Sequence, residues 1–188
     1  LEPHKVVDYQ QTVREALQLA GREQMPVIYV ERRQRPLDEL RANEHHYCDA
    51  LTQGRELRAT EGAAEAGGAV LPSTDPLYIL YTSGTTGTPK GVYRDIGGTA
   101  VSLMLSMELG FGFDADSVMF STSDLGWVVG HSYMLYGPLL FGATTILYEG
   151  KPVGTPDCLA YFRIVERHRA TVLYTSPTAM RAVMKEDY

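Results

Sequence analysis

The stretch LYILYTSGTTGTPKGV, residues 77–92, decides the fold and is the most informative part of the sequence. It opens with Leu77–Tyr81, a run of β-branched and aromatic residues that is typical of a buried strand. Hydroxyl side chains, three glycines and one cation follow. Glycines let a backbone turn tightly and approach a ligand closely, and successive N–H groups in such a loop form a concave anion site. The sequence therefore predicts a loop that holds a triphosphate, with the phosphate-binding candidates Thr82, Ser83, Gly84, Thr85, Thr86, Gly87 and Lys90.

This loop differs from the phosphate loop of the common NTPases. That loop has Gly-Lys-Ser/Thr at the start of a helix, whereas here Lys90 follows Pro89 and precedes the strand-like run Gly91–Tyr93. We therefore expect the loop itself to hold the phosphates, without a helix dipole behind it. The alternative is a flexible Gly/Ser/Thr linker, although a linker would not sit tightly between two apolar strands.

The motif YTSGTTGTPKGV resembles the phosphate-loop signature of the adenylate-forming superfamily, the AMP-dependent synthetases and ligases. A second stretch, SDLGWVVGHSYMLYGPLLFGATTILYEG at 123–150, followed by KPVGTPD, is similar to short-chain acyl-CoA synthetases, and most of all to the propionyl-CoA synthetase branch. Such enzymes are several times longer. The resemblance therefore implies an internal fragment, a partial AMP-binding (adenylation) domain over residues 1–188, with the C-terminal catalytic-lysine domain absent.

Composition restricts the class of protein. A chain of 188 residues with 44% hydrophobic and 21% charged residues is typical of one globular domain. The net charge of −6 argues against a nucleic-acid partner. No apolar run is long enough to span a bilayer, and no secretory leader is visible. Cys48 and Cys158 are isolated thiols, as in a reducing compartment. We expect a protein of the cytoplasm or the mitochondrial matrix, not secreted and without a membrane partner.

The alternation of patterns predicts an α/β fold with a doubly wound, largely parallel sheet. By resemblance, this is part of the large N-terminal domain of an acyl-CoA synthetase. Residues 31–74 are charged and rich in Ala and Gly, and they predict a variable surface connection. The predicted helices are Thr12–Ala20, Thr99–Leu109, His131–Leu140 with a kink at Pro138, Asp157–His168 capped by Asp157, and one capped by Ser176; the predicted strands are Pro26–Val30, Ser117–Ser121, Ala143–Tyr148 and Ala170–Tyr174.

One polar cluster suggests a metal site. His45, His46, Cys48 and Asp49 lie close together in the sequence, but no second Cys/His pair follows at zinc-like spacing. We predict a polar helix or loop there and no metal.

The second predicted site follows strand Ser117–Ser121, since ligands of open α/β sheets bind beyond the carboxyl ends of strands. Trp127, Val128 and Val129 form a small apolar wall, and Gly130 allows close approach of a ligand or of backbone. The resemblance implies that these three side chains line an acyl pocket; without it, the alternative is that all three pack in the core. Acetyl-CoA synthetases usually have Thr where Val129 stands, so propionate is favoured, with acetate or butyrate open. One methylene discriminates by only about 1–3 kcal/mol.

Other roles also rest on the resemblance. It places Val129, Val153 and Lys5 near CoA, although Lys5 stands where relatives carry Arg, and Lys lacks the planar guanidinium. A solvated surface charge is the alternative for Lys5, and a surface loop residue for Val153. We expect His131 to pack within the pocket, because a carboxylate substrate is already an anion and needs no general base.

The implied activity belongs to the parent enzyme: ATP, with Mg²⁺, activates a short-chain carboxylate as acyl-AMP, and the acyl group then passes to coenzyme A. Its partners would be the carboxylate, ATP, CoA and the remainder of its own chain. We expect the 188 residues alone to be inactive. The alternatives are an acetyl-CoA synthetase or another acyl-adenylating ligase and, in a different class, a truncated, non-catalytic nucleotide-binding or interaction module.

Overall fold

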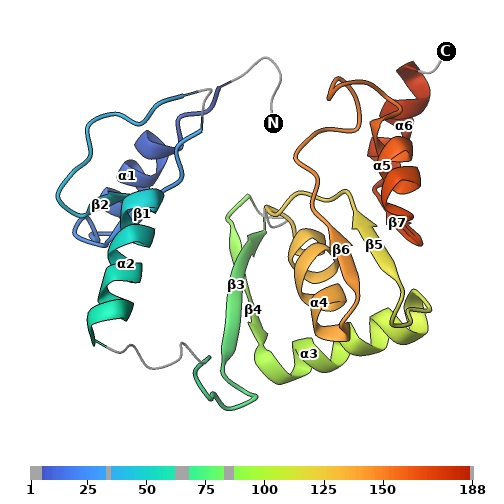
Figure 1. The fold of residues 1–188 in the computed structure, drawn as a ribbon, viewed down its shortest axis with the longest axis horizontal. Helices are drawn as coiled ribbons and strands as arrows, with labels where there is room; N and C mark the ends of the chain where they lie inside the picture. Colours follow the sequence, from blue (N-terminus) through green and yellow to red (C-terminus); the bar gives the residue numbers. More distant parts are fainter. Residues whose placement is uncertain (1–5, 33–34, 62–67, 83–86, 187–188) are drawn as a thin grey trace. The chain divides into compact units, whose positions relative to one another are not determined.

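The structure is a computed structural model that describes residues 6–32, 35–61, 68–82 and 87–186 (Figure 1). It divides into a first unit, Glu2–Ala69, and a second unit, Val70–Tyr188. Lys5, Ser83, Gly84, Thr85 and Thr86 lie outside the described residues.

The first unit contains two helices and a two-stranded parallel sheet. Helix α1, Tyr9–Leu19, begins three residues before the predicted start because the carboxylate of Asp8 accepts the Gln11 N–H at 3.2 Å and caps it. Strand β1, Val27–Tyr29, confirms the predicted strand and pairs with β2, Glu44–His46.

Helix α2, Tyr47–Glu61, lies within the predicted connection 31–74. Sequence periodicity did not predict it as a definite helix because its residues form no apolar face, and Leu51 and Leu57 are exposed.

The second unit begins with a hairpin. Strand β3, Pro76–Thr82, and strand β4, Lys90–Asp95, pair antiparallel, with Tyr78 opposite Arg94 and Thr82 opposite Lys90. Both predicted strands are confirmed. The prediction that the first of them is buried is wrong: every described side chain of β3 is exposed or half-buried, because a two-stranded hairpin has few neighbours to cover it.

The hairpin leads into helix α3, Ile96–Leu105, which continues as the π-helical segment η1, Ser106–Gly110. The helix begins three residues earlier than predicted because Asp95 caps it, its carboxylate accepting the Gly98 N–H at 2.7 Å.

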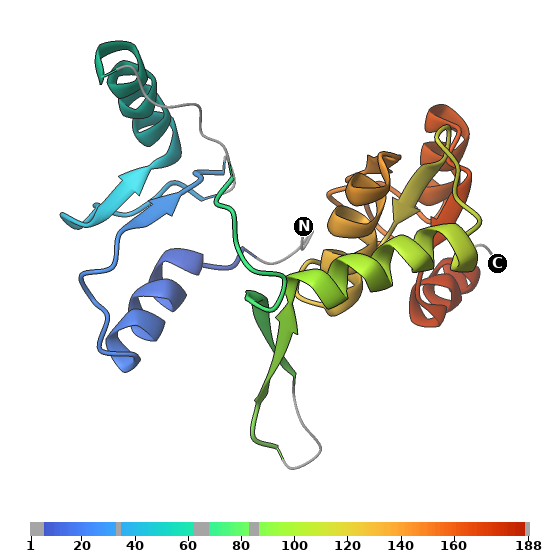
Figure 2. The ribbon, with the colours of Figure 1, turned by 90° about the horizontal axis from the view of Figure 1, so that it is seen from below.

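A three-stranded parallel sheet follows: β5, Val118–Ser121, lies between β6, Thr144–Ile146, and β7, Val172–Tyr174. After β5 the chain forms β6 on one side of it, and then passes back to form β7 on its other side. Because such crossovers are right-handed, reversing direction places the connecting helices on opposite faces. Figure 2 shows the helices on both sides of β5. The expected doubly wound, parallel arrangement is confirmed in this sheet.

The bounds of two predicted helices of this region differ from the prediction. The predicted helix His131–Leu140 consists of the π-helical η2, Gly130–Tyr136, and α4, Gly137–Phe141, with Pro138 where one becomes the other. The predicted helix from Asp157 begins later: α5 is Ala160–His168, because the Asp157 carboxylate instead accepts the Leu159 N–H at 2.9 Å ahead of the helix.

The last helix of the second unit is α6, Pro177–Glu186. Ser176 caps it as predicted, its hydroxyl accepting the Ala179 N–H at 3.1 Å.

The core of the second unit lies around β5. Met107, Phe113, Met119 and Ala143 form one buried cluster. On the other side of the strand, the ring of Phe120 meets the ring of Tyr161 edge-on at 5.6 Å. Since β5 contributes buried side chains on both faces, it anchors the loop that follows it, which carries Val128 and Val129.

Candidate functional site: the phosphate loop and the β4–α3 cleft

The predicted phosphate loop connects the two strands of the hairpin. Thr82 and Lys90 form the pair of the ladder nearest the loop, and both are exposed. Gly87 has φ +80°, in the left-handed region that favours glycine. An added Cβ at Gly87 would meet nothing within 4 Å, so the backbone there is open to a ligand. The remaining predicted phosphate ligands, Ser83, Gly84, Thr85 and Thr86, lie outside the described residues.

A cleft of about 440 Å³ lies in the second unit, and we call it the β4–α3 cleft. Its walls come from the hairpin, from α3 and from the segment that enters η2. The lining residues are Tyr78, Tyr93, Arg94, Asp95, Gly98, Thr99, Ser102, Leu103, Val128, Val129, Ser132 and Tyr133.

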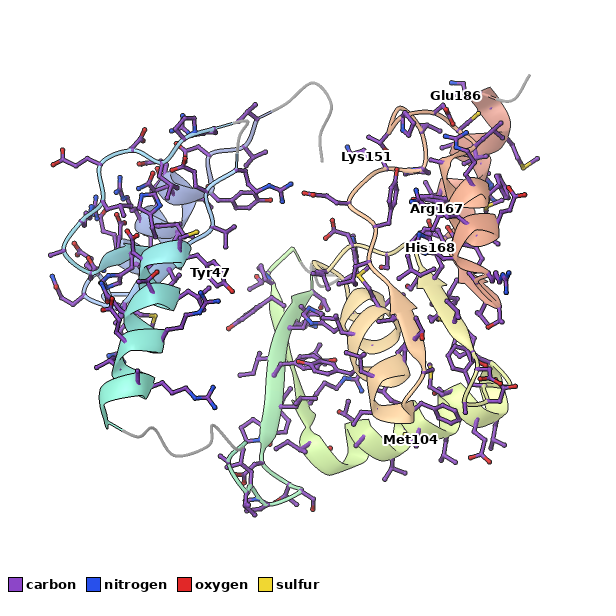
Figure 3. All side chains as sticks on the ribbon, viewed as in Figure 1. Tyr47, Met104, Lys151, Arg167, His168 and Glu186 are labelled. Atoms are coloured by element: carbon purple, nitrogen blue, oxygen red, sulfur yellow. The ribbon has the colours of Figure 1, made fainter. Side chains whose placement is uncertain are left out.

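Two of the three predicted acyl-pocket residues line this cleft. Val128 is 38% exposed and Val129 is half-buried, and both face it. Trp127 is 70% exposed and is not part of the lining. Val153 is half-buried in the segment that follows Lys151 between β6 and α5 (Figure 3), and it does not line the cleft either.

A tight turn holds the two valines in place. The Asp124 carboxylate accepts the Gly126 N–H at 2.6 Å, and the Asp124 carbonyl accepts the Trp127 N–H at 3.0 Å. Gly130 then packs directly on this turn: an added Cβ would clash with the Asp124 carbonyl oxygen and lie 2.9 Å from the Cα of Leu125. Gly130 therefore permits the close approach of backbone.

An aromatic stack joins the hairpin to η2. The ring of Tyr78 lies over the ring of His131, with centroids 5.3 Å apart, and over the ring of Tyr136, with centroids 6.1 Å apart. Offset-stacked rings at such distances attract each other beyond their area burial. The stack ties the strand that precedes the phosphate loop to the segment that carries the valine wall.

The polar side chains of the cleft differ in their hydrogen-bond partners. The Asp95 carboxylate is bound to the Gly98 N–H at 2.7 Å, and the Tyr93 hydroxyl donates to the Thr74 carbonyl at 2.9 Å. In the part of the chain that the structure describes, the Arg94 side chain has no hydrogen-bond or ion-pair partner. Sequence reasoning missed Arg94 and Asp95, and the one signal was a charged pair at the end of a predicted strand.

The described residues contain no group of three or more His, Cys, Asp or Glu side chains placed to hold a metal ion. Within the same residues, no helix combines the length and the apolar character needed to cross a membrane. Cys48 is exposed, Cys158 is half-buried, and both are free thiols.

Comparison with known proteins found relatives that are named as acyl-CoA synthetases and ligases. Over 190 residues it is 45% identical to human "Acyl-CoA synthetase short-chain family member 3, mitochondrial", covering 100% of this chain and 26% of the relative. Over 181 residues it is 40% identical to the propionate–CoA ligase of Escherichia coli, covering 96% of this chain and 28% of the relative. The chain therefore spans little more than a quarter of the length of these relatives.

A solved structure and a family model agree with these relatives. The acetoacetyl-CoA synthetase from Streptomyces lividans matches with a TM-score of 0.73 and 30% identity, over 96% of this chain and 26% of that chain. The family model described as "AMP-binding enzyme" matches residues 5–188. Because this match spans nearly every residue, the chain belongs to the AMP-binding enzyme family.

Proposed function

We propose that this chain forms the phosphate-binding and acid-binding part of an ATP-dependent acid–CoA ligase. The enzyme would activate a short-chain carboxylate, with propionate as the first choice, as acyl-AMP and then transfer the acyl group to CoA. One observation carries the proposal: Val128 and Val129 line the same cleft as Arg94. Arg94 lies on β4, the strand that follows the phosphate loop. An acetyl-CoA synthetase is the alternative within the same chemistry.

The phosphate loop would bind the β- and γ-phosphates of ATP. The residues assigned to this role are Thr82, Ser83, Gly84, Thr85, Thr86, Gly87 and Lys90. The exposed Lys90 and the open backbone at Gly87 support it, because backbone N–H groups and a lysine ammonium suit phosphate oxygens. Catalysis by such a loop consists of positioning the phosphates and stabilising the charge that develops on them.

The acid would lie in the β4–α3 cleft with its alkyl group on Val128 and Val129, and with Trp127 beside them. Its carboxylate oxygen attacks the α-phosphorus, the bond to the bridging oxygen breaks, and pyrophosphate leaves. In the second step the CoA sulfur attacks the acyl carbon and AMP leaves. Val129, Val153 and Lys5 are assigned to the CoA side.

Mg²⁺ would enter with ATP, whose phosphate oxygens supply its ligands. We assign no side chain of this chain to the metal. The remaining partners are the rest of the enzyme and the three substrates, with no nucleic acid and no membrane. The compartment would be the cytoplasm or the mitochondrial matrix; several relatives, the human protein among them, are named as mitochondrial.

The test is acid-dependent ATP–pyrophosphate exchange by the full-length protein with acetate, propionate and butyrate. We expect the highest kcat/KM with propionate. Val129→Thr should move the acetate-to-propionate preference towards acetate by roughly tenfold or more, because a hydroxyl replaces a methyl group in the wall. The control is Val101→Thr, since Val101 is exposed on α3 and outside the cleft. Absence of exchange with every acid would refute the ligase, and exchange by the isolated 188 residues would refute the expectation that the fragment is inactive.

A second candidate, a non-catalytic interaction module, is favoured by one observation. Ile79 and Tyr81 project from the hairpin and are 59% and 70% exposed. Large apolar side chains gathered on a surface indicate a face that another polypeptide covers. Light scattering of the isolated chain should then show self-association. A monomer that remains stable at high concentration would argue against both the module and a covered hairpin face.

A further inference from the structure

We propose that Arg94 is an acid-binding residue of the β4–α3 cleft: its guanidinium binds a carboxylate or oxo oxygen of the acid whose alkyl part packs on Val128 and Val129. This inference rests on the proposed function and deepens it, because it names the group that recognises the polar part of the substrate.

The first support is the register of the hairpin. Tyr78 pairs with Arg94, and Thr82 pairs with Lys90. Directly opposite residues, and residues two apart on a strand, share one face, so all four side chains lie on the same face of the hairpin. The ring of Tyr78 on this face stacks on His131 of η2. Arg94 therefore faces the segment that supplies the valine wall, which agrees with its place in the cleft lining.

The second support is the spacing along β4. Lys90 and Arg94 are four residues apart on one strand, which corresponds to about 13 Å at the usual rise per residue. Both cations lie on one face, and Lys90 is the phosphate-loop cation. A strand with two cations at this separation suits two anionic groups held side by side, the phosphates of a nucleotide at one end and an acid at the other.

The third support is the state of the Arg94 charge. Other arginines among the described residues hold carboxylates: Arg14 binds Glu44, Arg35 binds Asp8, and Arg163 binds Asp157. No such pair is formed by Arg94 within the described residues. Its neighbour Asp95 does not neutralise it, because that carboxylate caps α3 through the Gly98 N–H. The cation therefore remains available to a ligand.

The chemistry of the lining selects the class of ligand. A guanidinium offers paired N–H donors that match two carboxylate oxygens. Thr99, Ser102 and Ser132 add hydroxyls around it, and the valines supply the apolar surface. The volume of 440 Å³ lies in the range that holds ligands larger than a three-carbon acid. The bound oxygen can therefore belong to the reacting carboxylate or to a second oxygen-bearing group of a dicarboxylic or oxo acid.

The experiment uses the full-length protein and ATP–pyrophosphate exchange with propionate, succinate and acetoacetate. In Arg94→Met, which keeps the aliphatic stem, we expect KM for the acid to rise roughly 10- to 100-fold, as for loss of a hydrogen bond to a charged group. KM for ATP should stay within about twofold of its original value. In Arg94→Lys the KM for the acid should lie between that of the unsubstituted enzyme and that of Arg94→Met, because lysine retains the charge and lacks the paired N–H donors of the guanidinium. A rise for all acids identifies the reacting carboxylate, and a rise only for succinate and acetoacetate identifies the second group.

The matched control is Arg167→Met, on α5 and outside the cleft (Figure 3). It should leave both KM values unchanged. An unchanged acid KM in Arg94→Met, or an equal rise in the KM for ATP and for the acid, would overturn the proposal while leaving the ligase intact. If none of the acids supports exchange by the unsubstituted enzyme, the proposed ligase function itself is refuted. Should Arg94→Met not fold, Arg94→Lys decides by the same ratio of KM values.

Discussion

The ring of Tyr78 lies on the ring of His131, with centroids 5.3 Å apart and 26° between the two planes. Tyr78 is four residues before Thr82 on β3, and His131 is two residues after Val129. This contact, with the stack of Tyr78 on Tyr136, therefore joins the strand that enters the phosphate loop to the segment that presents the valines. If the proposed function holds, the acid and the nucleotide must meet in one geometry, and this contact would help to set their separation.

Tyr78→Leu removes that contact. A stacked aromatic pair contributes about 0.5–1.5 kcal/mol beyond its buried area, so the free energy of unfolding should fall by about that amount. A urea titration of Tyr78→Leu, His131→Leu and the double variant should show a coupling of similar size. Tyr81→Leu is the control, because Tyr81 lies on the same strand and is mostly exposed. Additive effects in the cycle would show that the rings do not stabilise each other.

Gly130→Ala tests the turn beneath the valine wall. The added methyl group would clash with the Asp124 carbonyl oxygen, a backbone atom that cannot swing away. Overpacking of this kind costs about 1–3 kcal/mol, and relief of the clash should displace Val129. We expect a lower free energy of unfolding together with a higher KM for the acid. Gly110→Ala, where an added Cβ meets nothing within 4 Å, should change neither. If the KM for the acid is unchanged in Gly130→Ala, the turn does not position Val129 for binding of the acid.

Glu44 gives the first unit a defined response to acid. Its side chain is buried, and its carboxylate accepts hydrogen bonds from Arg14 Nε at 2.7 Å and from the Arg41 N–H at 2.9 Å. The hydrogen bond from Arg14, with the backbone hydrogen bond from Arg41, lowers the pKa of Glu44 from 4.5 to about 2. A depressed carboxyl pKa stabilises the folded state fully above the unfolded value and loses that contribution as pH falls.

The expected result is that the stability contributed by Glu44 is present above about pH 4.5 and declines as pH falls towards 2. Unfolding of the unsubstituted chain and of Glu44→Gln, measured at several pH values, should give two curves that converge over this range. The control is Glu15→Gln, which removes an exposed carboxylate from the same helix as Arg14. When both chains carry Glu15→Gln, the two curves, with and without Glu44→Gln, should converge over the same pH range. A constant difference between the two curves from pH 6 to pH 2 would contradict the prediction.

Phe120→Ala tests the core around β5. Phe120 is fully buried, and its ring meets the rings of Tyr148 and Tyr161 edge-on. Truncation of such a ring costs about 3–5 kcal/mol through lost burial and the cavity it leaves. Phe162→Ala, at a half-exposed position on α5, should cost far less. Denaturant unfolding followed by circular dichroism measures both, and equal losses would show that the core does not centre on β5.

Local patterns predicted most of the elements of the second unit. Runs such as Val118–Ser121 and Val172–Tyr174 are short, apolar and bounded by polar residues, so each identifies itself as a strand. The same patterns say nothing about which strands pair. The antiparallel β3–β4 hairpin therefore emerged only in the structure. In the first unit, α2 lacks the apolar face on which a periodicity argument depends.

The cleft shows the same division between local and long-range information. The sequence predicted the valines as an apolar wall after a strand, and both of them do line the cleft; the phosphate role of the glycine-rich loop stays a prediction. Arg94 was not predicted, because 34 residues of chain separate it from Val128 and no spacing rule relates a strand end to a later helix start. Tertiary packing brings these residues together, and a single sequence carries no record of that packing.

The π-helical form of Gly130–Tyr136 gives this segment a tolerance of length that a regular α-helix lacks. Such segments hold one residue more than an α-helix would need to cover the same rise. Deleting a single residue there would let the segment close as an ordinary α-helix while its two flanks keep nearly the same relative rotation, whereas one deletion in a regular α-helix turns its flank by about 100°. Val128 and Val129 would then stay close to the cleft. On the proposed function, descendants of this gene could lose one codon here and keep their choice of acid, whereas substitutions in the wall would change that choice gradually.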